Sequence, residues 1–384
     1  MGCHYGTICN KTSYFRTPCG TEQGIESTAY LDPTTQRLNL EYQSRKKLAA
    51  TYIDLLKPYH VLACSLSPVE SMTSSTVKKL IKLGTDGEEE KLENSARFLT
   101  KARRETELSL MKSHLPLSIS DSAFVRYDEK QINLFRCLII PGGSSTPYAH
   151  GSFIFDIHLD NYPTYPPTVR LINKPEDVRF GPDFLPSGRV HLNYVSESGG
   201  IAQGTVWLAT NTITDVILMI LKLLSDENIV ERARISGTPE EINRQNRAYS
   251  NVVKMATLSH MIIDTIRNPM PEFEKAIKIH YYLTKQLVLK HVRDWIEDAD
   301  RHLPIDYSGL LEDHNPKLVK VIRSKEKFLQ HLRDSYLELE VQLELLKVKV
   351  AKMLPMSNDQ TPQHTEEHKE NREPRSRIDL EFHN

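Results

Sequence analysis

Four short runs of sheet-forming residues lie close together between residues 124 and 172, and helical patterns flank this block on both sides. The runs are Phe124–Tyr127, Ile132–Ile140, Phe153–Leu159 and Val169–Ile172. In the third run apolar residues alternate with polar ones such as Asp156, which predicts a half-buried strand. The short connections between the runs, such as the turn-rich segment 141–147, predict an antiparallel four-stranded meander. With helices before and after it, this meander places the chain in the α+β class.

The flanking helices are predicted from composition and periodicity. Residues 88–113 include many strong helix formers and no Gly or Pro. Apolar residues spaced by three and four over 213–224 predict an amphipathic helix capped by Asn211 or Thr212. Further helices are expected at about 249–266, 271–298 and 316–354. Within the last, Leu337–Leu345 alternates like a strand, but it is built of helix formers and an isolated strand there would have no partner. We interpret it as helix.

These patterns divide the chain into four parts. Residues 1–90 are expected to be a largely irregular N-terminal extension, and residues 91–268 to be the α+β core. Residues 269–354 are expected to form a helical C-terminal extension. The charged residues 355–384 contain few apolar side chains and predict a disordered tail.

Charge and cysteine content exclude several classes of protein. Lys and Arg number 49 against 50 Asp and Glu, so no excess of positive charge favours nucleic acid. No uninterrupted apolar stretch is long enough for a membrane span. Five cysteines, an odd number, favour a reducing compartment over a disulfide framework. Cys3, Cys9 and Cys19, with His4, are spaced too widely for a typical zinc site. We therefore expect no metal and no cofactor.

Four motifs occur in order over the core and the helix that follows it. Residues 146–151 read Thr-Pro-Tyr-Ala-His-Gly, and residues 162–167 read Tyr-Pro-Thr-Tyr-Pro-Pro. Residues 178–192 contain Val-Arg-Phe-Gly-Pro-Asp and then Gly-Arg-Val-His-Leu, and Trp207 precedes the helix at 213–224. In type and order these motifs resemble those of ubiquitin-conjugating enzymes, which have the UBC fold. The resemblance covers about residues 95–330 and is closest to the Z-type enzymes, which also carry extensions on both sides of the core.

The resemblance implies where the active site should lie, and this sequence departs from the family there. The family's catalytic Cys stands nine residues after the motif Pro and three after the Gly; counted from Pro182 and Gly188, that position is His191. A thiolate forms a persistent thioester, whereas an acyl-imidazole should hydrolyse quickly. The family's motif Asn is Asp183 here, and an ionised carboxylate cannot donate a hydrogen bond to an oxyanion. Gly181 replaces the family's His or Asn before the Pro.

The surfaces that the family uses for its partners are also altered. Lys101, Arg103 and Arg104 lie on the first helix, where the family binds its activating enzyme, although a basic run on a helix is usually only a solvated face. Thr164 stands where ligase-binding members often carry Phe, and Leu-Ala-Thr follows Trp207 in place of Ser-Pro-Ala. Trp207 itself is most simply explained as core packing.

Several interpretations of His191 and of the whole chain stay open. His191 could be a structural loop residue, or a metal ligand with His150, His158 or Asp183. Cys137, in an apolar run, should be an inert buried thiol. We favour a catalytically inactive UBC-fold protein that binds ubiquitin or a ubiquitin-like protein, an activating enzyme or ligase, or an active conjugating enzyme, in the cytoplasm and the nucleus. The alternatives are a Z-type transferase and a helical interaction scaffold.

Overall fold

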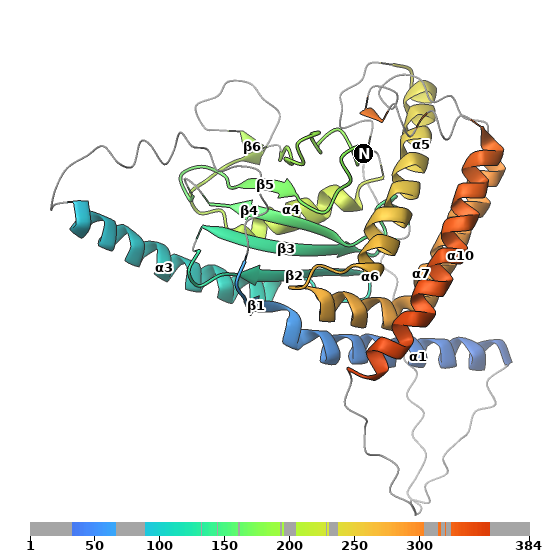
Figure 1. Ribbon diagram of the computed structural model, residues 1–384, viewed down its shortest axis with the longest axis horizontal. Coiled ribbons are helices and arrows are strands. Elements are labelled where there is room, and N and C mark those ends of the chain that lie inside the picture. The colour runs from blue at the N-terminus through green and yellow to red at the C-terminus, as the bar shows by residue number, and fades with distance from the viewer. Residues whose placement is uncertain are drawn as a thin grey trace, which may run out of the picture. The chain divides into compact units, whose positions relative to one another are not determined.

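The computed structural model describes most of the chain between residues 33 and 353 (Figure 1). The described ranges are 33–66, 89–131, 133–143, 145–159, 162–192, 194–195, 205–227, 229, 237–302, 314–315, 319 and 324–353. The chain divides into two units, Met1–Lys47 and Leu48–Asn384. The expectations for Cys3, Cys9, Cys19, His4 and the tail fall outside the described residues.

The centre of the second unit is a five-stranded sheet in the order β1-β2-β3-β4-β5. The antiparallel strands are β2 (Asp121–Tyr127), β3 (Leu134–Pro141), β4 (Phe153–His158) and β5 (Thr168–Leu171). The predicted four-stranded meander is therefore confirmed. A short parallel strand, β1 (Val61–Ala63), extends it beside β2.

The described residues of the N-terminal region, 33–66, form a helix and a strand. In place of irregular chain, Pro33–Leu56 forms helix α1, followed by the 3₁₀ turn η1 (Lys57–Tyr59) and then β1. Backbone hydrogen bonds from Val125 N to His60 O (2.8 Å) and from Cys64 N to Tyr127 O (2.9 Å) hold β1 against β2. A strand of three residues is too short to show a periodicity, so the sequence alone did not indicate it.

The helices of the core lie close to their predicted positions. They are α3 (Glu89–His114), α4 (Ile213–Ser225), α5 (Pro239–Ala256), the π-helical turn η3 (Thr257–Asp264) and α6 (Thr265–Arg267). Thr212 caps α4 in a reciprocal capping box with Asp215. On α4, Ile217 and Ile220 are fully buried, as the amphipathic pattern predicts. Helix α5 starts ten residues before the first apolar residue of the predicted pattern, Tyr249, because Thr238 caps it with Glu241.

Two long helices follow the core and run side by side (Figure 1). They are α7 (Glu274–His302) and α10 (Lys325–Ala351), and Ser324 caps the second. Leu337–Leu345 lies inside α10, so its interpretation as helix is confirmed. None of the described helices is long and apolar enough to cross a bilayer. A small parallel pair, β6 (Tyr194–Val195) and β7 (Thr205–Val206), lies outside the main sheet.

One prediction about the sheet was wrong: β4 is not half-buried. Its polar residue Asp156 is 3% exposed and forms a two-point ion pair with Arg136, with nitrogen–oxygen distances of 2.7 and 3.0 Å. Glu272, just before α7, pairs with the same guanidinium at 2.7 Å. Arg126 donates to the Glu272 carbonyl at 2.8 Å and lies over the ring of Phe273. The C-terminal segment thus covers the face that the alternation assigns to solvent.

Candidate functional site

The loop after β5 turns back along the strand and brings the predicted site residues together. Leu171 N donates to Gly188 O at 2.8 Å, and Val190 N donates to Val169 O at 2.8 Å. Through these bonds residues 188–190 pair antiparallel with the outer edge of β5, and an isolated β-bridge between Arg170 and Arg189 belongs to the same pairing. We call this segment the return. The sheet therefore fixes the position of the chain just before His191.

Gly188 is required by this return. Its φ is +84°, in the left-handed region that side chains disfavour. A Cβ atom there would lie 2.6 Å from the Leu171 carbonyl oxygen, closer than Cβ atoms approach other atoms in proteins. The Gly that precedes the family's catalytic position thus has a local structural reason in this chain.

His191 is exposed, and its backbone N–H donates to the Asp183 carbonyl at 2.7 Å. This bond fixes the His191 backbone beside the Gly-Pro-Asp motif, as the resemblance implies. Asp183 is 6% exposed, so its carboxyl group lies inside the loop and not beside bulk water. The site accordingly offers solvent an imidazole and keeps a carboxyl group behind it.

Arg179 organises the Gly-Pro-Asp turn from within. Its Nε donates to Phe184 O (2.9 Å) and Gly181 O (3.3 Å), and its Nη2 donates to Pro182 O (2.8 Å). Three carbonyl oxygens converge on one guanidinium, which fixes the turn that carries Asp183. Sequence reasoning missed this role, although the Val-Arg-Phe part of the motif contained the signal.

Three segments distant in sequence hold the same turn from outside. Tyr148, from the Thr-Pro-Tyr motif, donates to Phe180 O at 2.6 Å. Asn315, which is fully buried, accepts from Arg179 N at 2.8 Å and donates to Arg179 O at 3.2 Å. Tyr249 of α5 bonds both Arg179 O (3.3 Å) and the ring of His314 (2.8 Å). Nothing near Asn315 in the sequence indicates this contact, which joins residues 136 positions apart.

Arg104 of α3 is engaged within the core. Arg104 is 8% exposed, donates to Asp128 O at 2.6 Å and lies over the rings of Tyr127 and Phe135. Burial lowers the pKa of its guanidinium. Arg104 therefore does not lie on a solvated face of α3, and its contacts are with the core of its own chain. The side chain of Lys101 lies outside the described residues.

Arg103 belongs to a polar cluster that joins α3 to the start of α4. It donates to Tyr162 OH and to Asn211 O, both at 3.0 Å. Glu107 accepts from Tyr162 OH through one carboxylate oxygen and from Ile213 N at 2.9 Å through the other. Tyr162 therefore has a structural role: through its hydroxyl group it connects the Tyr-Pro motif to the N-terminus of α4. Burial is the main cause of its raised pKa.

The loops at Thr164 and after Trp207 lie next to each other. Trp207 is 5% exposed, and its Nε1 donates to Pro163 O at 2.8 Å, so its role is packing. Around it, Thr164 is exposed, and Tyr165 and Leu208 are 58% and 47% exposed. This pair of loops presents apolar side chains to solvent. We call it the loop surface.

Neither cysteine in the described part of the chain can replace the missing thiol. Cys137 lies fully buried in β3, and burial raises the pKa of its thiol. Cys64 directly follows β1, and burial is also the first cause of its raised pKa. Because β1 and β5 are the opposite edges of the sheet, Cys64 and the His191 loop are separated by roughly 19 Å of strand spacing.

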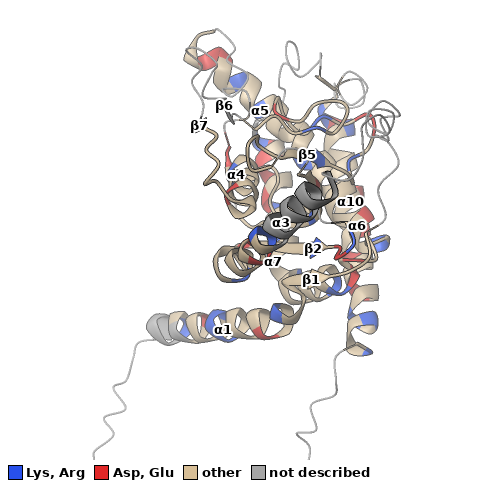
Figure 2. Cartoon of the chain, turned by 90° about the vertical axis from the view of Figure 1, so that its left-hand side faces the viewer, with Lys and Arg blue, Asp and Glu red and all other residues tan. Residues whose placement is uncertain are grey.

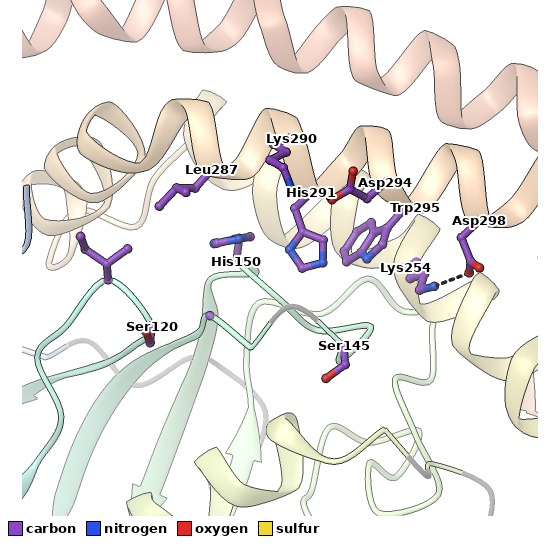
Figure 3. A pocket seen from close by; sticks show the side chains of 12 residues that line it. Ser120, Ser145, His150, Lys254, Leu287, Lys290, His291, Asp294, Trp295 and Asp298 are labelled. Atoms are coloured by element: carbon purple, nitrogen blue, oxygen red, sulfur yellow. Dashed lines mark hydrogen bonds and ion pairs between the residues drawn. The ribbon is translucent and has the colours of Figure 1, made fainter. Parts of the chain in front are cut away.

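A cleft lies elsewhere, between the core and α7 (Figure 3). This cleft of about 480 Å³ is lined by His150 of the Thr-Pro-Tyr turn and by His291 and Trp295 of α7, with an ion pair between Lys254 and Asp298 at 3.3 Å. The rings of His150 and His291 meet edge to face at 5.2 Å. His150 has a positive φ of 61°, where the family motif has Gly.

The structure does not bring together the metal ligands considered from the sequence. His150 lines the cleft beside α7, His158 ends β4, and Asp183 lies in the turn before His191. Within the described ranges no three His, Cys, Asp or Glu side chains meet in a way that could hold a metal ion. The chemistry that the site itself offers is that of an exposed imidazole on a rigid loop.

Comparison with known proteins agrees with this reading of the fold. The family model described as ubiquitin-conjugating enzyme matches residues 103–257. The chain is 30% identical over 236 residues to the dual E2 ubiquitin-conjugating enzyme/E3 ubiquitin-protein ligase BIRC6 of Homo sapiens, covering 59% of this chain and 5% of that protein. It is 28% identical over 213 residues to the probable ubiquitin-conjugating enzyme protein 17 of Caenorhabditis elegans, covering 54% and 29% of the two chains.

A plant protein gives a similar match. The putative ubiquitin-conjugating enzyme E2 38 of Arabidopsis thaliana is 29% identical over 189 residues, covering 48% of this chain and 55% of that one. The chain thus spans only part of each of these relatives. It contains a ubiquitin-conjugating-enzyme (UBC) family domain, and the observed α+β arrangement is the UBC fold with a helical C-terminal region.

Proposed function

We propose that this chain acts in the ubiquitin pathway as a catalytically inactive UBC-fold protein, an adaptor or regulator that binds other components of the pathway. The observation that carries the proposal is the exposed imidazole of His191, at the position that the resemblance assigns to the catalytic Cys, on a loop held by backbone hydrogen bonds. An acyl group on imidazole is hydrolysed too readily to be carried to a lysine, whereas a thioester persists. The buried carboxyl group of Asp183, where the family has Asn, adds a second obstacle to transfer.

The partners we propose are ubiquitin or a ubiquitin-like protein together with an activating enzyme, a ligase or an active conjugating enzyme. The loop surface supports binding of a protein partner, because Tyr165 and Leu208 are exposed on a frame fixed by Trp207. Arg104 does not support docking through the basic run of α3, since it is buried. A likeness to Z-type enzymes and a place in the cytoplasm and nucleus belong to the same proposal.

The test is a charging assay with the full chain, activating enzyme, ATP and ubiquitin, read on gels with and without reducing agent. We expect no reducing-agent-sensitive adduct on the wild type. The matched control is His191→Cys, which supplies a thiol at the same position and should charge. A wild-type adduct mapped by mass spectrometry to any of the five cysteines would overturn the proposed inactivity and favour the transferase alternative.

Binding is measured separately with the immobilised chain. Ubiquitin, activating enzyme and a charged conjugating enzyme are passed over the wild type and over Tyr165→Ala/Leu208→Ala. Binding of at least one of them, weakened in the double variant, supports the adaptor role through the loop surface. A wild type that binds none of the three would contradict the adaptor role and favour the helical scaffold.

A further inference from the structure

Helix α10 has two apolar faces, and one of them faces solvent. Along its inner face Leu332, Leu339, Leu343, Leu346 and Val350 are buried. A second set, which we call the outer stripe, consists of Leu337 (59% exposed), Val341 (53%), Leu345 (52%) and Val348 (59%). At about 100° per residue these four side chains lie within an arc of roughly 80°, on the side of the helix opposite the inner face.

The outer stripe differs from the scattered apolar residues that are found on most protein surfaces. Single exposed apolar residues are common on soluble proteins, but four along three turns of one helix form a continuous patch. The spacing of four and three residues between Val341, Leu345 and Val348 is that of a seam between two helices. Helix α7 packs on the other side of α10, so it cannot cover this seam.

The charges around the outer stripe are sorted by sign along the helix. From residue 334 to 344 the sequence has four carboxylates, Asp334, Glu338, Glu340 and Glu344, and no Lys or Arg. From 345 to 352 it has three lysines, Lys347, Lys349 and Lys352, and no acid. Blue residues accordingly dominate the last turns of α10 in Figure 2.

The helix dipole does not explain the acidic half. Its effect is confined to the first and last turns, and α10 begins at Lys325, well before Asp334. Two of the carboxylates have partners in the same chain: Glu338 pairs with Arg267 at 2.7 Å, and Glu344 pairs with Lys285. Asp334 and Glu340 form no ion pair among the described residues, so the acidic half carries carboxylates that a partner can still pair.

We propose that the outer stripe binds the outer stripe of a second copy of this chain, with the two α10 helices antiparallel. In that arrangement Val341 lies level with Leu345 of the other copy, and Leu337 lies within one residue of the level of Val348. The same register places Asp334 of each copy opposite Lys352 of the other. At about 100° per residue, Asp334 and Lys352 lie at the same angle on the helix, within the arc of the stripe and beyond its two ends. An ion pair can therefore form at each end of the seam.

Symmetry and charge together favour the antiparallel arrangement of the two α10 helices over a parallel one. An isologous two-fold contact brings one surface against itself, so the surface must be self-complementary. The antiparallel register joins acidic and basic halves in both directions, whereas a parallel register would place acid against acid. The stripe is roughly 16 Å long, so the contact is smaller than a standard interface and the dimer should dissociate in the micromolar range.

The test is sedimentation velocity of the full chain at concentrations from about 1 to 100 µM, the range in which an interface of this size dissociates. We expect a concentration-dependent dimer. Val341→Glu/Leu345→Glu should abolish it, and circular dichroism should show an unchanged fold because both positions are exposed. Tyr165→Glu, at a similarly exposed residue of the loop surface, is the matched control and should dimerise like the wild type.

Charge reversal tests the antiparallel register itself. Asp334→Lys or Lys352→Asp alone should weaken the dimer at low salt, since each places like charges opposite one another. The double variant Asp334→Lys/Lys352→Asp should restore association, because both pairs re-form with reversed sign. A chain that stays monomeric over the whole range overturns the proposal, including one whose stripe is covered by its own tail. A dimer that persists in the Val341→Glu/Leu345→Glu variant, or a double reversal without rescue, overturns it as well.

Discussion

His191 and Asp183 differ from the residues of the ubiquitin-conjugating enzymes in different ways, and a substitution at each position should restore a different step. His191 lies on a backbone held by the Asp183 carbonyl and by the return along β5, so a thiol placed there inherits a rigid position. Asp183 lies inside the turn organised by Arg179, and its ionised carboxyl group can only accept hydrogen bonds. Under the proposed function, the change at His191 concerns the nucleophile, and the change at Asp183 concerns the charge that would develop when a lysine attacks.

The residue-scale prediction separates these two steps. His191→Cys should form a thioester, because transfer from an activating enzyme needs mainly a thiolate at this position. Discharge to free lysine should be slow, since loss of one oxyanion donor lowers the rate on the order of a hundredfold or more. Adding Asp183→Asn should accelerate discharge clearly. Single-turnover discharge of both variants measures this, with His191→Ala as the uncharged control, and equal rates would show that Asp183 does not limit transfer.

At the scale of elements, α4 allows a prediction with an internal control. Ile220 is fully buried against the sheet, whereas Leu218, two residues earlier, is 37% exposed. Ile220→Asp places an unpaired charge in the core and should cost several kcal/mol of unfolding free energy. Leu218→Asp carries the same side chain on the same helix and should cost far less. Thermal or urea unfolding followed by circular dichroism compares them, and similar losses would refute the assigned face.

The elements also show which parts of the fold were readable from sequence. The apolar period of 3.6 residues predicted the position of α4, and the short sheet-forming runs predicted the positions of β2 to β5. Both signals can be read from neighbouring residues, because the pattern of buried side chains repeats within each element. Strand β1 was not predicted, since three residues carry no period. Asp156 in β4 was placed on a solvent face, because its partners Arg136 and Glu272 come from other segments.

The candidate site divides in the same way. Gly188 and His191 were identified from the motif spacing. The positive φ of Gly188 explains why a Gly stands there, and a backbone hydrogen bond fixes the position of His191. Arg104 was interpreted as a surface cation, although it packs on Tyr127 and Phe135, which only the folded sheet brings to it. Asn315, which fixes Arg179, could not be found, because a contact over 136 residues leaves no local pattern.

At the scale of the whole molecule, the core and the C-terminal helices share buried groups that bind protons differently in the folded and unfolded states. His280 of α7 is 1% exposed and bonded to Tyr52 OH at 2.8 Å, and His150 of the core is 6% exposed beside His291. Tyr281 OH donates to His150 O at 2.7 Å, which joins α7 to the core turn. Burial, followed by a neighbouring imidazole, lowers the pKa of both histidines from 6.5 to about 3.

The sign of the resulting pH dependence follows from these values. Between pH 6.5 and about 3 the unfolded chain binds protons at these histidines and the folded chain does not, so stability falls as the pH falls. Between about pH 7 and 5 each histidine should remove about 2 kcal/mol of unfolding free energy. His150→Gly and His280→Gln should each reduce this loss, whatever they do to stability at neutral pH. Urea unfolding at both pH values measures the difference, with His114→Gln, an exposed residue, as the control that keeps the wild-type loss. If both variants lose as much stability as the wild type on acidification, the two histidines are not buried in their neutral form and the core does not enclose them as described.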